Sequence, residues 1–159
     1  MTYVVSLLFH RKITAGPFTR RLRLRYSSNV GATDQARGQT SRLIAIIDDD
    51  ESIQASLRDL MESTGLVARC FGSTEEFLEY DLHCEAGCLI AEIQMSGMSG
   101  LELQARLKEE QCNIPIIFIA SNGGARIRIR AMREGAVEFL AKPLDYQLLL
   151  KTVRAALDL

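Results

Sequence analysis

The sequence predicts an α/β fold built around a parallel five-stranded sheet. From Leu43 onward, short apolar segments of strand length alternate with segments of helical period. The apolar segments are nearly continuous in hydrophobic residues, as in strands that are buried on both faces. Strands that alternate with helical crossovers of about a dozen residues favour a doubly wound arrangement, with helices on both faces of the sheet.

Five segments are predicted strands. They are residues 43–48, 66–71, 88–92, 115–120 and 137–141. In a flavodoxin-like (βα)5 fold with strand order 2-1-3-4-5, the carboxyl ends of the strands at the switch point meet at one edge of the sheet. We therefore expect the ends of strands one, three, four and five to lie close together, at Asp48/Asp49, Glu92, Ala120 and Lys142.

The predicted helices have recognisable ends. Two Ser/Glu pairs have the spacing of a capping box, in which a hydroxyl and a carboxylate each bind a free backbone N–H at the helix start. These pairs are Ser73 with Glu76 and Ser99 with Glu102. Asp145 is placed to cap the last helix, and Gly65 and Gly135 stand where the first and fourth helices should end.

The charge pattern divides the chain near residue 42. Residues 1–42 hold eight basic residues and one acidic residue, a net charge of +7, whereas the remainder holds 11 basic and 19 acidic residues, a net charge of −8. We expect residues 1–42 to be a basic, disordered N-terminal extension and residues 43–159 to be the folded domain. Binding of the extension to an anionic surface, or a role as a targeting peptide, are the alternatives.

Cysteine usage and hydropathy indicate a reducing, cytoplasmic setting. The chain has four cysteines and no convincing export signal, which argues against a disulfide framework. No stretch approaches the ~20 apolar residues that span a bilayer, so we expect no membrane association.

A zinc site is the alternative interpretation of His83, Cys84 and Cys88. Structural zinc sites need four ligands, and Cys70 and Cys112, both distant in the sequence, would have to complete this one. Because Cys70 and Cys88 lie within apolar segments, the pattern favours cysteines that act as small hydrophobic residues.

The predicted strand edge carries candidate metal ligands. Carboxylates gathered at one edge repel each other and favour a hard divalent cation, and Asp48, Asp49 and Glu92 supply the oxygen ligands. Mg²⁺ is the natural ion where a phosphoryl group is handled, and Lys142 supplies a mobile positive charge. The three aspartates at 48–50 alone would suit the solvated start of a helix. Glu92 and Lys142 at the same edge favour the metal site.

These features resemble the receiver domain of response regulators in two-component systems. The resemblance covers residues 43–159 and is especially close to receivers of nitrogen-fixation and LuxR-type regulators in residues 116–142. It implies that Asp49 binds Mg²⁺ directly and Asp48 largely through water, with the backbone carbonyl of Gln94 as a further ligand. It also implies that Lys142 contacts the phosphoryl group.

Two further residues take roles from the same resemblance. Phe139 stands at the position of the aromatic switch residue. Pro143 is expected to follow a cis peptide bond.

The sequence departs from the receiver pattern at three positions. Glu92 stands where receivers have the phosphoacceptor aspartate, and Ala120 stands where they have the Thr or Ser whose hydroxyl drives the switch. Ser121 does not replace that hydroxyl, because a one-residue shift along a strand turns the side chain to the other face. Ser96 replaces a proline of the following loop. The leading hypothesis is a single-domain receiver with phosphorylation impaired or lost, which acts by docking to proteins and is not an enzyme.

The sequence leaves two other functions open. The first is a phosphorylation-competent receiver that accepts a phosphoryl group from a histidine kinase. The second is a flavodoxin-like enzyme or small-molecule-binding protein, which is disfavoured because the chain has no Walker loop and no G-x-G-x-x-G turn after the first strand.

The expected partners are a histidine kinase or another signalling protein. A homodimer is expected through the predicted fourth helix, fifth strand and fifth helix. Arg126, Arg130 and Arg133 share one face of that fourth helix, whereas Arg128 is placed where it could reach the acidic cluster. No helix-turn-helix segment follows Leu159, so we expect no DNA-binding domain in this chain.

Overall fold

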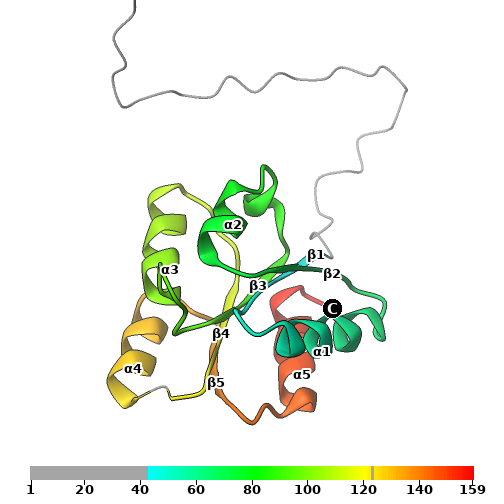
Figure 1. Ribbon diagram of the computed structural model, residues 1–159. Coiled ribbons are helices and arrows are strands. Elements are labelled where there is room, and N and C mark those ends of the chain that lie inside the picture. Colours follow the sequence, from blue (N-terminus) through cyan, green and yellow to red (C-terminus); the bar gives the residue numbers. More distant parts are fainter. Residues whose placement is uncertain (1–42, 123) are drawn as a thin grey trace, which may run out of the picture. The chain divides into compact units, whose positions relative to one another are not determined.

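The computed structural model describes residues 43–122 and 124–159, so the predicted N-terminal extension, residues 1–42, lies outside the described residues. Strands and helices alternate along the described chain (Figure 1). Their order is β1 Leu43–Ile47, α1 Glu51–Glu62, β2 Val67–Phe71, α2 Thr74–Glu79, the 3-10 turn η1 His83–Glu85, β3 Cys88–Glu92, α3 Gly100–Glu109, β4 Ile116–Ala120, α4 Ala125–Arg133, β5 Glu138–Ala141 and α5 Tyr146–Ala156. None of the helices in this part of the chain has the length and apolar content that crossing a bilayer requires.

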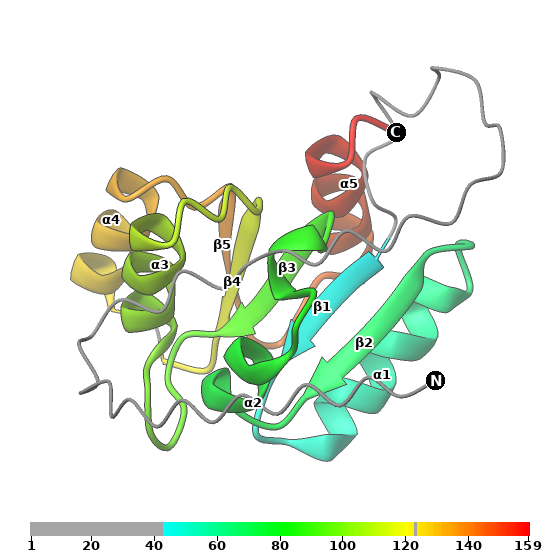
Figure 2. The ribbon, with the colours of Figure 1, turned by 90° about the horizontal axis from the view of Figure 1, so that it is seen from above.

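The five strands form one parallel sheet in the order β2-β1-β3-β4-β5, as predicted (Figure 2). Strand β3 has the predicted bounds, and each of the other four is one residue shorter at one end than the apolar pattern indicated. Strand β2 is an edge strand, and its alternate residues are exposed. Strands β1, β3 and β4 are buried along almost their whole length, which explains their continuous apolar sequences.

Helices pack on both faces of the sheet (Figure 1). Side chains of β1 point alternately to the two faces, so Ile44 and Ile46 join one core cluster while Ala45 and Ile47 join the other. The first cluster includes apolar side chains of α1 and α5. The second includes side chains of α2, α3 and α4. Helices thereby cover both faces of the sheet, and the ends of the strands lie along its edges.

Most of the predicted helix ends are confirmed. The carboxylate of Asp145 accepts hydrogen bonds from two backbone N–H groups at the start of α5, and Ser99 with Glu102 forms a complete capping box at α3. Gly65 and Gly135 have positive φ angles of 79° and 101° after α1 and α4, where a side chain would be strained.

The capping box predicted at Ser73 is only half formed. Ser73 Oγ accepts the backbone N–H of Glu76, as expected. The carboxylate of Glu76 instead accepts the N–H of Gly72, at 2.7 Å, rather than that of Ser73. The exposed turn after β2 brings the Gly72 N–H within reach, which the residue spacing alone does not reveal.

The prediction that the cysteines form no disulfide is wrong for one pair. Cys84 and Cys112 are joined by a disulfide, with their Cα atoms 5.2 Å apart. The turn η1 carries Cys84 next to the segment that precedes β4, and a separation of 28 residues concealed this proximity. Cys70 and Cys88 are free, and Cys88 is buried, where loss of solvation raises the pKa of its thiol to about 12.

Gly100 begins α3 where the helix packs closely against β3 and β4. A Cβ atom at this position would lie 2.8 Å from Cε1 of Phe118 and 3.0 Å from the backbone oxygen of Glu92. The absence of a side chain therefore lets α3 start directly beside the end of β3.

We expect Gly100→Ala to lower the free energy of unfolding by about 1–3 kcal/mol, because overpacking outweighs the gain in helix propensity. Urea unfolding followed by circular dichroism measures this change. Gly72→Ala is the matched control, since its Cβ would make only ordinary contacts, 3.6 Å from the nearest atom. Equal stability of the two variants would contradict the close packing at Gly100.

Candidate functional site

Asp48 follows β1 and is buried, with 1% of its surface exposed. Its Oδ1 accepts the backbone N–H of Asp50 at 2.9 Å, and its Oδ2 accepts a hydrogen bond from Lys142 Nζ at 3.0 Å. Its backbone oxygen accepts the side-chain amide of Gln54 at 2.7 Å. Both oxygens of this carboxylate are therefore held by the protein.

Glu92 is the last residue of β3 and is 4% exposed. Its Oε1 accepts the backbone N–H groups of Ile93 and Gln94, at 3.1 and 3.2 Å. Its Oε2 lies 2.7 Å from Lys142 Nζ, as an ion pair without regular hydrogen-bond geometry. The longer glutamate side chain thus folds back over its own backbone while one oxygen contacts the lysine.

Lys142 follows β5 and contacts both carboxylates. Its Nζ lies between Asp48 and Glu92, while its backbone N–H donates to the oxygen of Ala120 at 2.8 Å. Burial by itself would lower the pKa of the ammonium group. The contacts that the ammonium group makes with Glu92 and Asp48, and the negative charges of both carboxylates, outweigh this effect and raise the pKa above its ordinary value. The peptide bond to Pro143 is cis, as expected.

The three consecutive aspartates occupy different environments. Asp50 caps α1, and the backbone N–H groups of Ser52 and Ile53 lower its pKa. Asp49, between the two held aspartates, is exposed and makes no hydrogen bond or ion pair with any described residue. The helix-start interpretation therefore fits Asp50, whereas Asp48 belongs to the cluster around Lys142.

Ala120 ends β4 and is completely buried. The next residue, Ser121, is exposed, as the alternation of side chains along a strand predicts. Phe139 of β5 is also buried, at 4% exposed, and is the register partner of Phe118 in the sheet. The aromatic side chain therefore lies in the core beneath the edge. Gln94 is exposed at the start of the loop after β3.

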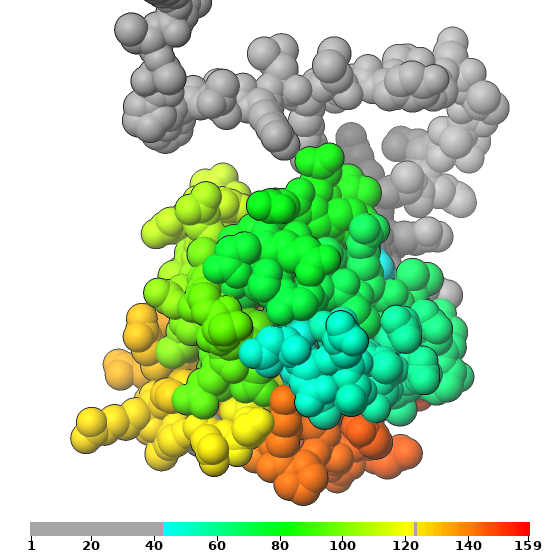
Figure 3. All heavy atoms as spheres, viewed as in Figure 1, coloured from blue at the N-terminus to red at the C-terminus, as the bar shows by residue number. Residues whose placement is uncertain are grey.

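The predicted meeting of strand ends is confirmed for the cluster of Asp48, Glu92 and Lys142. Figure 3 shows, on one face, the start of α1 in cyan next to the segments after β3, β4 and β5, in yellow-green, yellow and orange. Residues from three strand ends therefore form one site, which we call the acidic edge: Asp48, Asp49, Glu92 and Lys142.

Two residues of α2 hold the loop after β3, and no motif in the sequence indicates this role. Thr74 Oγ1 donates to the backbone oxygen of Met98 at 2.9 Å, and Glu75 Oε1 accepts the Met98 N–H at 3.0 Å. This N–H bond from Met98 is the largest cause of the lowered pKa of Glu75. Thr74 is only 1% exposed, which marks its role in the structure. Threonine is common at helix starts, so its position in the sequence does not reveal this role.

The arginines of α4 lie apart from the acidic edge. Arg128 pairs with Glu138 of β5, with 3.6 Å between Nη2 and Oε1, so the expectation that it reaches the acidic cluster is wrong. Glu138 begins β5, the strand next to α4, and the sequence did not indicate that Arg128 would pair with it. Arg126, Arg130 and Arg133 line one shallow surface with Ile129, as their spacing predicted.

Comparison with known proteins identifies the family. The family described as "Response regulator receiver domain" matches residues 44–154. The response regulator protein TodT of Pseudomonas putida is 42% identical over 117 residues, which cover 74% of this chain and 52% of that protein. The transcriptional regulatory protein TdiR of Thauera aromatica is 40% identical over 116 residues, covering 73% of this chain and 51% of that protein. The chain thus spans about half the length of these relatives.

Solved structures agree with this result. The response regulator StyR matches with a TM-score of 0.66 and 37% identity, over 73% of this chain and 59% of that one. A response regulator receiver protein from Pseudoalteromonas atlantica matches with a TM-score of 0.69 and 27% identity, over 73% of this chain and 97% of that one. From the sheet order, the acidic edge and these matches together, the chain belongs to the response regulator receiver domain family of two-component signalling.

Proposed function

We propose that this domain is an atypical receiver whose phosphorylation is impaired or lost and whose output is docking to other proteins. The observation that carries the proposal is the contact of Lys142 with Glu92 and Asp48, at 2.7 and 3.0 Å. In the family, the corresponding lysine is expected to contact the phosphoryl group. Here it is already neutralised by two carboxylates of the chain.

The glutamate side chain makes phosphoryl transfer to position 92 unfavourable. Its extra methylene displaces the carboxylate, and a misplacement of about 1 Å can cost on the order of 10²-fold in rate. Two backbone N–H groups and Lys142 also hold its oxygens, so the carboxylate would have to leave these partners to react. With one negative charge, where a phosphoryl group has about two, Glu92 is an incomplete imitation of a phosphorylated acceptor.

The residue at the end of β4 supports the same proposal. Ala120 is buried beside the site and has no hydroxyl group to bind a phosphoryl oxygen. Ser121 is exposed, on the other side of the strand from Ala120. A phosphoryl group at position 92 would therefore lack the partner through which receivers rearrange.

The output surface that we propose is the face made by α4, β5 and α5. It carries exposed large apolar side chains, which in a small domain indicate a surface for protein contact. They are Ile129, Met132, Val137, Tyr146 and Leu148. A second copy of the domain or another signalling protein would bind this face. A histidine kinase in the cytoplasm is the upstream partner that membership of the family supports.

The alternative function is a competent receiver that is phosphorylated by a histidine kinase. The position of Glu92 favours it, because the carboxylate lies at the end of β3 in contact with Lys142. The two functions differ in one measurable property, the transfer of a phosphoryl group to the chain.

The residues of the acidic edge fit a weakly held Mg²⁺ ion. The carboxylate of Asp49 is available to bind the ion, because it is exposed and makes no hydrogen bond or ion pair within the described chain. Asp48, Glu92 and the Gln94 carbonyl would complete an oxygen set, but Lys142 competes for both carboxylates. Bound Mg²⁺ would neutralise charge on a phosphoryl group at this edge.

Acetyl phosphate with Mg²⁺ tests the proposed loss of phosphorylation. We expect the unaltered chain to gain no phosphoryl mass, because Glu92 is misplaced and Lys142 is engaged. Glu92→Asp combined with Ala120→Thr should restore labelling, whereas Glu92→Asp alone should restore little of the conformational response. Intact-mass spectrometry measures the labelling, and NMR measures the response.

Ser121→Ala in the double-variant background is the matched control and should label normally, because its side chain lies on the other face. Labelling of the unaltered chain to the same extent as the double variant would refute the proposal and support the competent receiver.

A magnesium titration tests the acidic edge itself. We expect Asp49→Asn to weaken Mg²⁺ binding by at least ~10-fold, since it removes the one unengaged carboxylate ligand. Asp50→Asn is the control, because it removes the same charge from the next residue and asparagine caps a helix as well as aspartate does. Chemical shifts in NMR report the binding. Equal weakening by both variants would indicate a general charge effect rather than a ligand.

Because Lys142 pairs with two buried carboxylates, we expect the free energy of unfolding to depend on pH in a defined way. We expect Lys142→Met to lower the free energy of unfolding at pH 7 by on the order of 3 kcal/mol, because two buried carboxylates lose their cation. The pKa of Lys142 is raised in the folded state, so its contribution is complete below the ordinary lysine value of 10.5 and is lost as pH rises through the folded value.

The difference in free energy of unfolding between the unaltered chain and Lys142→Met should therefore stay constant from neutral pH to about 10 and shrink above it. Urea unfolding curves measure this difference. The exposed Lys151→Met on α5 should change stability by no more than about 0.5 kcal/mol at any of these pH values. If the stability difference between the unaltered chain and Lys142→Met shrank only on acidification, the pH dependence would not come from the ammonium group of Lys142.

A further inference from the structure

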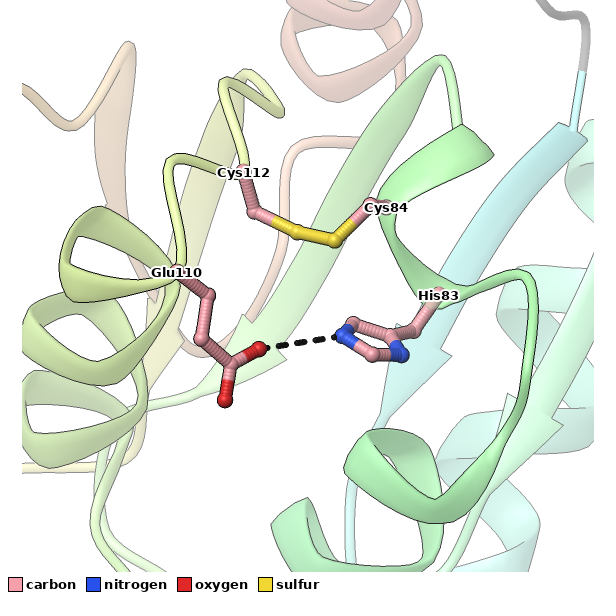
Figure 4. A group of neighbouring side chains, drawn as sticks. All are labelled: His83, Cys84, Glu110 and Cys112. Carbon is pink, nitrogen blue, oxygen red and sulfur yellow. Dashed lines mark hydrogen bonds and ion pairs between the residues drawn. A yellow bond between two sulfur atoms is a disulfide. The ribbon is translucent and has the colours of Figure 1, made fainter. Parts of the chain in front are cut away.

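A second cluster of ligating side chains lies at the opposite end of the strands from the acidic edge. His83 and Cys84 belong to η1, which precedes β3, and Glu110 and Cys112 lie between α3 and β4. Figure 4 shows the disulfide joining the two segments, with His83 and Glu110 facing each other beside it. Because the cluster precedes both strands, it lies at their amino ends, away from Glu92.

The ligand atoms are already close to the spacing of a metal site. Nitrogen, sulfur and carboxylate atoms of the four residues all lie within 4.8 Å of one another. In a tetrahedral zinc site with bonds of about 2.0–2.3 Å, ligand atoms lie roughly 3.3–3.8 Å apart. Once the disulfide is reduced, movements of about 1 Å in side chains, three of which are at least partly exposed, would complete the geometry.

His83 is oriented as a ligand before any metal binds. Its Nδ1 lies 2.7 Å from the backbone oxygen of Tyr80, a contact that favours the tautomer in which Nδ1–H donates. The other nitrogen, Nε2, faces Glu110 Oε2 at 3.3 Å. The ring also packs edge-on against the buried Phe77, with centroids 5.6 Å apart. Metal-binding histidines are commonly fixed by such a bond to a backbone carbonyl.

Cys112 is held in place by the end of α3. Gln111 has a φ of 59°, the left-handed conformation that ends helices, and its N–H donates to the oxygen of Lys108. The N–H of Cys112 donates to the oxygen of Leu107 at 2.8 Å, which completes a Schellman motif. This turn places Glu110 and Cys112 in one cluster, although Gln111 stands where glycine is usual.

We propose that the reduced form of this cluster is a Zn²⁺ site with Cys84, Cys112, His83 and Glu110 as ligands. Two thiolates, an imidazole and a carboxylate are a donor set that zinc accepts in tetrahedral geometry. The proposal is independent of the acidic edge. It also corrects the zinc interpretation of the sequence, which paired His83 and Cys84 with Cys88, a residue that lies in β3 as a buried free thiol.

The charge of the site is compatible with a divalent ion. Two thiolates and the Glu110 carboxylate exceed the charge of Zn²⁺ by one, and Arg106 supplies the missing positive charge with its Nε 2.6 Å from Glu110 Oε1. This hydrogen bond is the main cause of the lowered pKa of Glu110.

The metal-bound and disulfide forms exclude each other. A peroxide would take two electrons from the two zinc-bound thiolates, so that the S–S bond forms, the peroxide and two protons become water, and Zn²⁺ is released. A phosphine reductant and water reverse the sulfur step, giving two thiols and a phosphine oxide. The cluster would thus hold zinc in a reducing compartment and a disulfide in an oxidising one.

Cobalt substitution tests the proposal directly. The full chain is reduced with a phosphine, the reductant is removed without air, and Co²⁺ is added as the probe. We expect visible absorption of tetrahedral, thiolate-bound Co²⁺ that saturates at one equivalent per chain and disappears when Zn²⁺ displaces it. Hydrogen peroxide should release the Zn²⁺ as the disulfide forms, measured with a metal indicator and by intact mass.

Matched variants identify the ligands. Cys84→Ser, at an exposed position, should weaken Co²⁺ binding by more than ~10-fold, whereas Cys70→Ser should leave it unchanged. Circular dichroism verifies folding, and Glu110→Gln, also on the surface, replaces Cys84→Ser if that variant unfolds. Octahedral absorption only, or equal weakening by Cys70→Ser, would overturn the proposal.

Discussion

The contact of Lys142 with Asp48 and Glu92 is the interaction on which the acidic edge depends. Strands β1 and β3 are neighbours, and Asp48 and Glu92 follow the paired residues Ile47 and Ala91. Two almost completely buried carboxylates are thus forced side by side, where their repulsion is strong unless a cation lies between them. Lys142 is that cation, and the backbone bond from its N–H to Ala120 fixes it to the end of β4.

The same contact connects the stability of the site with the function that we propose for it. A receiver with a free lysine could use it for an incoming phosphoryl group, but here the lysine already satisfies the carboxylates of the chain. Releasing it would leave buried negative charge unpaired, which is costly. This cost supports the proposal that the site keeps one state and does not switch between two.

Sequence patterns were sufficient for the fold and for part of the site. Continuous apolar segments located all five strands to within one residue, because burial on both faces leaves little freedom of composition. The strand order then brought Asp48, Glu92 and Lys142 together. Hydrogen-bond partners were not predictable in the same way. The carboxylate of Glu76 accepts the N–H of Gly72, and Arg128 forms an ion pair with Glu138. Cys84 lies beside Cys112 because of a short 3-10 turn, which has no apolar period that the sequence could reveal.

Strand β3 has a distinct consequence, because it separates two reactive groups of opposite chemical character. The carboxylates of the acidic edge lie at the Glu92 end of the strand, and the Cys84–Cys112 pair lies before Cys88. Five residues of extended chain span roughly 17 Å, about twice the Debye length of ~8 Å at physiological ionic strength. Salt screens buried charges less than exposed ones, but at an effective dielectric constant of about 20 two unit charges at this separation interact by only roughly 1 kcal/mol. A change of charge at one terminus of the strand therefore has a small effect on the groups at the other.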